Sequence, residues 1–278
     1  MEVILTLLGA IIGYLLGKVD LIDKWREARD RNVQALNFDI RKVGKNILNI
    51  FRKDELIIAI AWSGIIGGSK YAYPVASGGE IKALKYALPV LSQKYKGTYI
   101  NLIFEELFGE NQEHLLYKNL ILFGGPMGNK LTYRIMMDNV IFENLPATFG
   151  YILNQKFDTK EFDNPTIYHS KSPFQPIVGT KVEEGKIVYD CGTIINIPSK
   201  GNRKNRIVIV AGSRKEGVVL AAKYLFTEKV NEIDINFKKI RNNKNYAYQV
   251  ILGSKVTRNE ILDGSEELLS SFEFEIKW

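Results

Sequence analysis

The sequence predicts an α/β fold in which a mostly parallel, doubly wound (Rossmann-like) sheet carries helices on both faces. Two apolar runs, Leu56–Trp62 and Arg206–Gly212, predict buried strands because each is nearly continuous and ends in glycine or a polar loop. Strand patterns alternate with helical patterns, as is typical of a doubly wound sheet. Residues 140–199 contain short apolar runs separated by Gly, Pro, Asn and Asp, so we expect a β-rich insertion or antiparallel extension there.

An uncharged apolar segment opens the chain. Val3–Gly17 carries no charged residue, and Val19, Leu21 and Ile22 extend the apolar character. A membrane span needs about 20 such residues, so we expect a transmembrane anchor over residues 1–22. Lysines and arginines follow this segment and none precedes it. The positive-inside rule then predicts a single-pass membrane protein whose C-terminal domain is cytoplasmic.

Three glycines in this segment recur at every fourth position: Gly9, Gly13 and Gly17. They would share one helix face, where two helix backbones approach closely. We therefore expect a homo-oligomer that associates through the anchor. The alternative is that glycine is simply common in short anchors.

The next segment, residues 23–53, predicts an amphipathic helical stem. Its apolar residues from Val33 to Ile50 alternate between steps of three and four. This pattern fits either a short coiled coil or a helix packed on its own domain. The predicted organisation is thus an anchor (1–22), a stem (23–53) and a Rossmann-like domain (54–278).

Glycine-containing turns predict the binding site. Phe123–Asn129 and Val210–Gly217 each lead from a strand into a helix, and a third helix begins at Ser77–Glu80, which fits a capping box. Ligands of open α/β sheets bind beyond the carboxyl ends of the strands, and helix N-termini favour phosphate or carboxylate. We predict a site for an anionic, nucleotide-like ligand, with Arg214 and Lys215 as cations. The candidate ligand-binding residues are Ser77, Gly78, Gly79, Gly124, Gly125, Pro126, Asn129, Gly212, Ser213, Arg214 and Lys215. Ordinary turn chemistry is the alternative explanation, because neither turn matches a Walker A loop or G-x-G-x-x-G.

Whether the chain is an enzyme stays open at this point. Five carboxylates lie near predicted strand or helix ends, and Glu80 is the preferred catalytic candidate; the others are Glu105, Glu106, Asp138 and Asp190. One cysteine, Cys191, and two separated histidines, His114 and His169, offer little material for a metal site, so no metal and no cofactor are expected. The net charge of +7 includes basic stretches at 198–206 and 238–245, but they lack interleaved aromatic residues, so nucleic acid is not an expected partner.

The two turn regions resemble a domain found in S-layer-type proteins of methanogenic archaea and in related uncharacterised prokaryotic proteins. The matching positions are Gly124, Gly125, Pro126, Asn129 and Thr132, followed by Ala211, Gly212, Gly217, Ala221 and Ala222. The resemblance covers roughly Leu56–Phe226 and departs from the family at Ser199–Asn202, where members usually have Asn-Pro-Trp or Asn-Pro-Phe. It implies a Rossmann-like fold and an envelope structural protein. The residues themselves predict two other functions in place of an envelope structural protein. One is a membrane-anchored sensor or effector that binds a nucleotide-like ligand, and the other is a nucleotide or NAD hydrolase.

Overall fold

The structure is a computed structural model of the chain. It describes Arg26 and residues 29–38, 55–60, 62–66, 73–76, 78–95, 98–104, 112–171, 175–201 and 205–278. The α-helices are α2 (Arg31–Leu36), α3 (Gly78–Lys94), α4 (Lys130–Met137), α5 (Asn139–Asn144), α6 (Gly150–Phe157), α7 (Lys215–Phe226) and α8 (Lys238–Asn242). Two 3-10 helices are η2 (Gln112–Tyr117) and η3 (Glu228–Glu232). The strands are β1 (Glu55–Ile60), β2 (Trp62–Ile66), β3 (Tyr73–Ala76), β4 (Tyr99–Phe104), β5 (Asn119–Phe123), β6 (Ala147–Phe149), β7 (Thr166–His169), β8 (Pro176–Gly179), β9 (Lys181–Glu183), β10 (Lys186–Pro198), β11 (Arg206–Gly212), β12 (Tyr246–Thr257), β13 (Glu260–Ile261) and β14 (Glu267–Glu275).

Parallel strands form one half of the central sheet, in the order β4, β1, β5 and β11. In this register Ile58 of β1 lies opposite Leu102 on one side and Ile121 on the other. The two predicted apolar runs became β1 and β11, which like β5 are covered on both faces, although Trp62 lies in β2 and not in β1. Their carboxyl ends, at Ile60, Phe123 and Gly212, lie along one edge of the sheet.

The other half of the sheet is antiparallel, and it corrects the predicted fold class. β10 lies between β11 and β12 and is antiparallel to both, while β14 and β13 pair with β12 and β9 pairs with β10. The sheet is thus mixed, with more antiparallel than parallel pairings, and the prediction of a mostly parallel, doubly wound sheet is wrong. Short connections, such as the hairpin between β10 and β11, join antiparallel neighbours, whereas parallel neighbours need a crossover.

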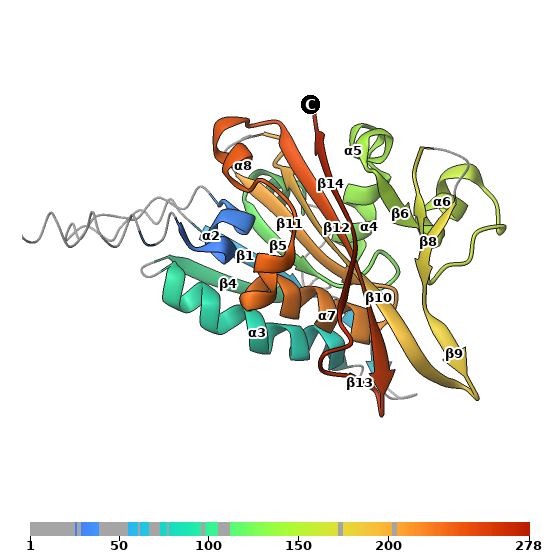
Figure 1. The fold of residues 1–278 in the computed structure, drawn as a ribbon. Coiled ribbons are helices and arrows are strands. Elements are labelled where there is room, and N and C mark those ends of the chain that lie inside the picture. The colour runs from blue at the N-terminus through green and yellow to red at the C-terminus, as the bar shows by residue number, and fades with distance from the viewer. Residues whose placement is uncertain are drawn as a thin grey trace, which may run out of the picture.

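Two apolar cores lie on the two faces of this sheet. On one face, alternate strand residues such as Ile58, Phe123 and Val210 pack against α2, α3 and α7. On the other face, the intervening residues, such as Leu122 and Ile209, pack against α4, α5 and α6. Figure 1 shows α3 and α7 side by side on the first face and α4 beyond the sheet on the second. Because side chains alternate along a strand, each buried strand serves both cores.

The segment predicted as β-rich hairpins, residues 140–199, also contains helices. It holds most of α5, the whole of α6 and a small sheet in the order β6, β7 and β8. Its last strand, β10, joins the main sheet antiparallel to β11 and β12, as the predicted alternative of an antiparallel extension requires. The glycine-rich stretch after β1 contains the antiparallel pair β2 and β3.

The described part of the predicted stem is built into the first core. Helix α2 ends at Leu36, and Asn37 adopts a left-handed conformation with φ 44°. Ala35 and Leu36 are fully buried, and the Asn196 side-chain amide and the Tyr248 hydroxyl donate hydrogen bonds to the Ala35 carbonyl. These residues therefore follow the second of the two alternatives, a helix packed on its own domain; residues 39–53 lie outside the described ranges.

The predicted location in a membrane needs correction. Among the residues that the structure describes, no helix combines the length and apolar composition needed to cross a membrane. This finding contradicts the prediction of a single-pass membrane protein with a cytoplasmic C-terminal domain. The segment on which it rested, residues 1–22, lies outside the described ranges, and its uncharged run is shorter than the roughly 20 residues that a span needs. The predicted self-association through Gly9, Gly13 and Gly17 stays a prediction, because these glycines also lie outside.

Candidate functional site

The first glycine turn joins β5 to α4 and is held by its own side chains. Gly124 has φ 113°, a conformation that glycine adopts without strain, and its N–H donates to the Val210 carbonyl of the neighbouring β11. Asn129 accepts a hydrogen bond from the Thr132 N–H and donates one to the Phe123 carbonyl, both at 3.0 Å. Asn129 is fully buried and caps α4, so this predicted ligand residue shapes the turn instead.

The second turn joins β11 to α7 and is fixed to β10 behind it. The Ser213 N–H donates to the Cys191 carbonyl at 2.9 Å, and the Ser213 hydroxyl lies 2.9 Å from the Cys191 sulfur. The Asp190 carboxylate accepts the Gly217 N–H at 2.5 Å and the Thr180 hydroxyl at 2.7 Å. Burial raises the pKa of Asp190 to about 6, against the lowering effect of these hydrogen bonds. The sequence placed Asp190 near a strand end but did not reveal this supporting role.

The third predicted start, that of α3, abuts the second turn. A Cβ added to Gly79 would lie 2.7 Å from the Lys215 Cβ, so the N-termini of α3 and α7 approach as closely as glycine allows. Gly78 is exposed and Glu80 is buried. Ser77 lies outside the described residues. The predicted convergence of three helix starts is therefore present for the residues that the structure describes.

A hollow of about 160 Å³ lies where these three starts meet. Its walls come from Glu80 of α3, from residues 125–128 of the first turn and from residues 212–215 of the second. Phe149, Tyr151, Asn164 and Val218 complete the lining. The hollow thus brings together Gly125, Pro126, Gly212, Ser213, Arg214 and Lys215 from the predicted set, whereas Gly78, Gly79, Gly124 and Asn129 do not line it.

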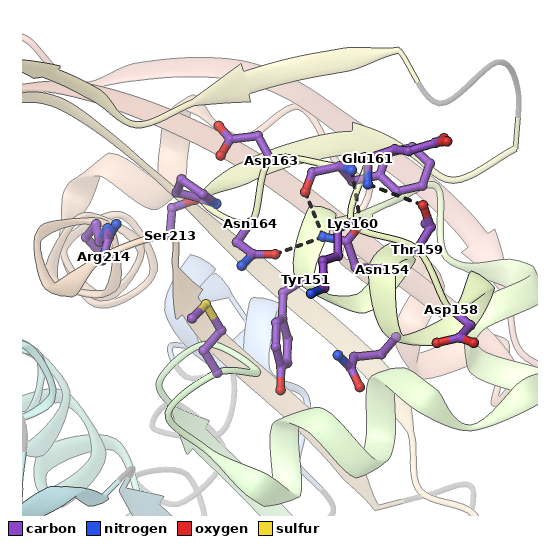
Figure 2. A pocket seen from close by; sticks show the side chains of 14 residues that line it. Tyr151, Asn154, Asp158, Thr159, Lys160, Glu161, Asp163, Asn164, Ser213 and Arg214 are labelled. Atoms are coloured by element: carbon purple, nitrogen blue, oxygen red, sulfur yellow. Dashed lines mark hydrogen bonds between the residues drawn. The ribbon is translucent and has the colours of Figure 1, made fainter.

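A larger hollow of about 950 Å³ adjoins the first one. Both are lined by Met127, Tyr151, Asn164, Ser213 and Arg214, so the two hollows share a wall, and together they are called the depression below. The outer wall of the larger hollow is the loop after α6, residues 158–165. Figure 2 shows this loop facing Ser213 and Arg214 across the depression, with Tyr151 between them.

One buried amide organises that loop. The Asn154 side-chain nitrogen donates to the Phe162 carbonyl at 2.7 Å and to the Asn164 side-chain oxygen at 2.9 Å, while its oxygen accepts the Phe162 N–H (Figure 2). Asp158 begins the loop with φ 49°. This loop was not predicted from the sequence, although all residues from Asp158 to Asn164 except Phe162 are polar.

The charges along the depression differ between its ends. Arg214 and Lys215 are exposed at the second turn, and the outer loop carries Asp158, Lys160, Glu161 and Asp163, all exposed. Glu80 is 5% exposed and also lines the smaller hollow, so an anion there is attracted by Arg214 and the helix N-termini and opposed by the Glu80 carboxylate. The arrangement suits a ligand with a negative group near the helix N-termini and hydrogen-bond donors, such as hydroxyls, near the acidic loop.

The other catalytic candidates do not gather here. Asp138 caps α5 by accepting the Val140 and Ile141 N–H groups, and Asp190 lies behind the second turn. Glu105 and Glu106 lie outside the described residues. Within the described ranges, no group of three or more His, Cys, Asp or Glu side chains is placed to hold a metal ion.

A comparison of the chain with protein-family models, with curated proteins and with solved structures finds no significant match in any of them. The resemblance to the S-layer-type domain therefore stays a prediction, and the site has to be interpreted from its own chemistry.

Proposed function

We propose that this protein binds an anionic, nucleotide-like small molecule in the depression formed by the two adjoining hollows. The observation that carries the proposal is the wall that the two hollows share, which includes Arg214, Ser213 and Tyr151. A ligand that spans the depression meets helix N-termini and a cation at one end and an aromatic ring and hydrogen-bond acceptors at the other. Chemical reactivity is not part of the proposal.

The smaller hollow supports placement of the negative group. Arg214 is the N-cap residue of α7 and is exposed, so an anion at this helix N-terminus can reach its guanidinium. The N-terminus of α7, a helix of 12 residues, adds a partial positive charge. Gly125 and Gly212 place only backbone on this wall, which leaves a phosphate room to approach.

The larger hollow supports the rest of a nucleotide rather than a bare anion. Tyr151 is half-buried and Met127 is 61% exposed, so both offer apolar surface to a planar base. Stacking of a base on an aromatic ring contributes about 1–3 kcal/mol. Asp163 and Asn164 on the opposing loop present oxygens that accept hydrogen bonds from sugar hydroxyls. The volume of about 950 Å³ suits a ligand of nucleotide size.

The test is the thermal unfolding of the full chain against nucleotides, dinucleotides, cyclic oligonucleotides and inorganic phosphate. A ligand present at about 100 times its dissociation constant adds about 2.7 kcal/mol to the free energy of unfolding, which raises Tm measurably. We expect at least one nucleotide to raise Tm and Arg214→Ala to abolish that rise. The matched control is Lys238→Ala, which removes an exposed cation that lines neither hollow. A panel without any shift refutes binding, and a shift that survives Arg214→Ala refutes the location.

A further inference from the structure

A third hollow, of about 300 Å³, lies between α3, α7 and the turn that joins β12 to β13. It shares only Lys215 with the residues that line the smaller hollow described above. Its walls carry Lys82 and Lys85 from α3, Lys215, Glu216 and Lys223 from α7, Glu260 from β13 and Asp263 beyond β13. Both signs of charge therefore line one small, partly open hollow.

Glu216 is the unusual member of this set. Its side chain is 3% exposed, and neither of its carboxylate oxygens accepts a hydrogen bond. The nearest cation is the Lys215 ammonium at 3.4 Å, and the Lys215 side chain is 50% exposed. Buried carboxylates in proteins almost always accept hydrogen bonds, because a buried polar atom without a partner is costly. The position of Glu216 in the first turn of α7 offsets part of this cost but supplies no donor to its oxygens.

The lysines around the hollow differ in how firmly they are engaged. Lys223 is held by Asp263 at 2.6 Å and by Glu266. Lys82 pairs with Glu260 at 3.2 Å, but both side chains are more than half exposed, so the pair is weak. Lys85 is exposed and makes no ion pair with any residue that the structure describes. Lys85 and Lys82 are thus the cations that a ligand can recruit.

We propose that this hollow binds a small zwitterion of the α-amino acid class, with its ammonium group on Glu216 and its carboxylate on Lys85 and Lys82. A simple anion would satisfy the lysines but face the buried Glu216 carboxylate. A simple cation would satisfy Glu216 but face the lysines. A molecule that carries both charges a few bonds apart satisfies both, and a hollow of about 300 Å³ holds one of amino-acid size.

The test uses the full chain, the twenty common L-amino acids, and their N-acetyl and carboxamide derivatives. We expect at least one free amino acid to raise Tm and to give a measurable dissociation constant by calorimetry. Its N-acetyl derivative, which lacks the ammonium, and its amide, which lacks the carboxylate, should bind at least about tenfold more weakly, because each loses a charged hydrogen bond.

Variants locate the site and separate it from the nucleotide site. Glu216→Gln and Lys85→Ala should each weaken amino-acid binding at least about tenfold. Glu228→Gln, which neutralises an exposed glutamate in the first turn of η3, and Arg214→Ala should leave it unchanged. Lys85→Ala introduces the best helix former at an exposed position of α3, so it tests the hollow without unfolding the helix.

Three outcomes would overturn the proposal: no amino acid raises Tm, the N-acetyl derivative binds as tightly as the free amino acid, or binding survives Glu216→Gln. Each of them leaves the nucleotide experiment unaffected, because that experiment depends on Arg214.

Discussion

The backbone carbonyl of Gly212 lies 2.7 Å from the point where a Cβ on Gly125 would sit. The two glycine turns of the candidate site therefore pack backbone against backbone, and the same glycines line the smaller hollow. Glycine at these positions serves the architecture of the strand ends whether or not a ligand binds between them.

This contact predicts that Gly125→Ala destabilises the protein. The new methyl group collides with a carbonyl that is fixed in β11, so the two turns have to separate, at a cost of about 1–3 kcal/mol in the free energy of unfolding. Urea denaturation measures the change. Gly78→Ala is the matched control, because a Cβ there meets nothing within 4 Å, and it should be neutral or slightly stabilising. Equal stabilities for the two variants would show that the turns are not tightly packed.

Asp190 predicts a pH dependence of stability. Burial raises its pKa from 3.8 to about 6, so the folded state binds this proton more tightly than the unfolded state. The resulting stabilisation is fully present below pH 3.8 and is lost as the pH rises through about 6. A shift of about 2 pKa units corresponds to about 3 kcal/mol. Asp190→Asn cannot titrate, so its stability relative to the wild-type chain should increase across this window.

Urea denaturation at a series of pH values measures that difference. The control is Asp234→Asn, which replaces an exposed aspartate and should follow the wild-type profile. A stability difference between Asp190→Asn and wild type that stays constant with pH would contradict the raised pKa.

Tyr248 predicts that α2 folds with the domain. Its fully buried hydroxyl donates to the Ala35 carbonyl at 2.7 Å, next to the bond from Asn196. Tyr248→Phe removes the donor and should cost about 1–2 kcal/mol, because it leaves a buried carbonyl with one partner fewer. Hydrogen exchange should quicken in residues 31–36. Tyr117→Phe, at a residue that is 47% exposed, should change neither quantity. Unchanged exchange in Tyr248→Phe would mean that α2 is not held by this contact.

The position of Tyr151 predicts that its ring contributes to binding of the base and not to binding of the phosphate. Tyr151→Leu keeps an apolar side chain but removes the aromatic ring. For a nucleotide that raises the Tm of the wild-type chain, the dissociation constant should therefore increase about tenfold, which corresponds to the loss of one stacked base. Binding of inorganic phosphate or pyrophosphate should not change, because Tyr151 presents no cation. Calorimetry with both ligand types measures this. An equal loss for nucleotide and pyrophosphate would show that the ring supports the fold of the depression rather than the base.

Local sequence patterns were sufficient to predict individual strands, helices and helix starts. The apolar run Arg206–Gly212 became β11, and the periodic stretch after it became α7, because continuous apolar character and helical spacing are properties of neighbouring residues. The helix starts at Gly78, Lys130 and Lys215 followed from turn chemistry in the same way. The sequence predicted that these turns would meet only if their strands were neighbours, and the pairing of β5 with β11 supplies that condition.

Only the tertiary structure decided which strands pair and in which direction. β10 forms a local hairpin with β11 but also pairs antiparallel with β12, and this second pairing joins residues more than fifty positions apart, such as Thr193 and Ile251, which no local pattern contains. The same holds for the site. Asn129 is buried and caps α4, and Asn154 hydrogen-bonds a loop that was not predicted. Gly79 packs against Lys215. Each of these roles depends on a partner that only the fold brings near. Residue type and spacing determined the elements and their ends, whereas long-range packing determined the mixed sheet and which side chains face the hollows.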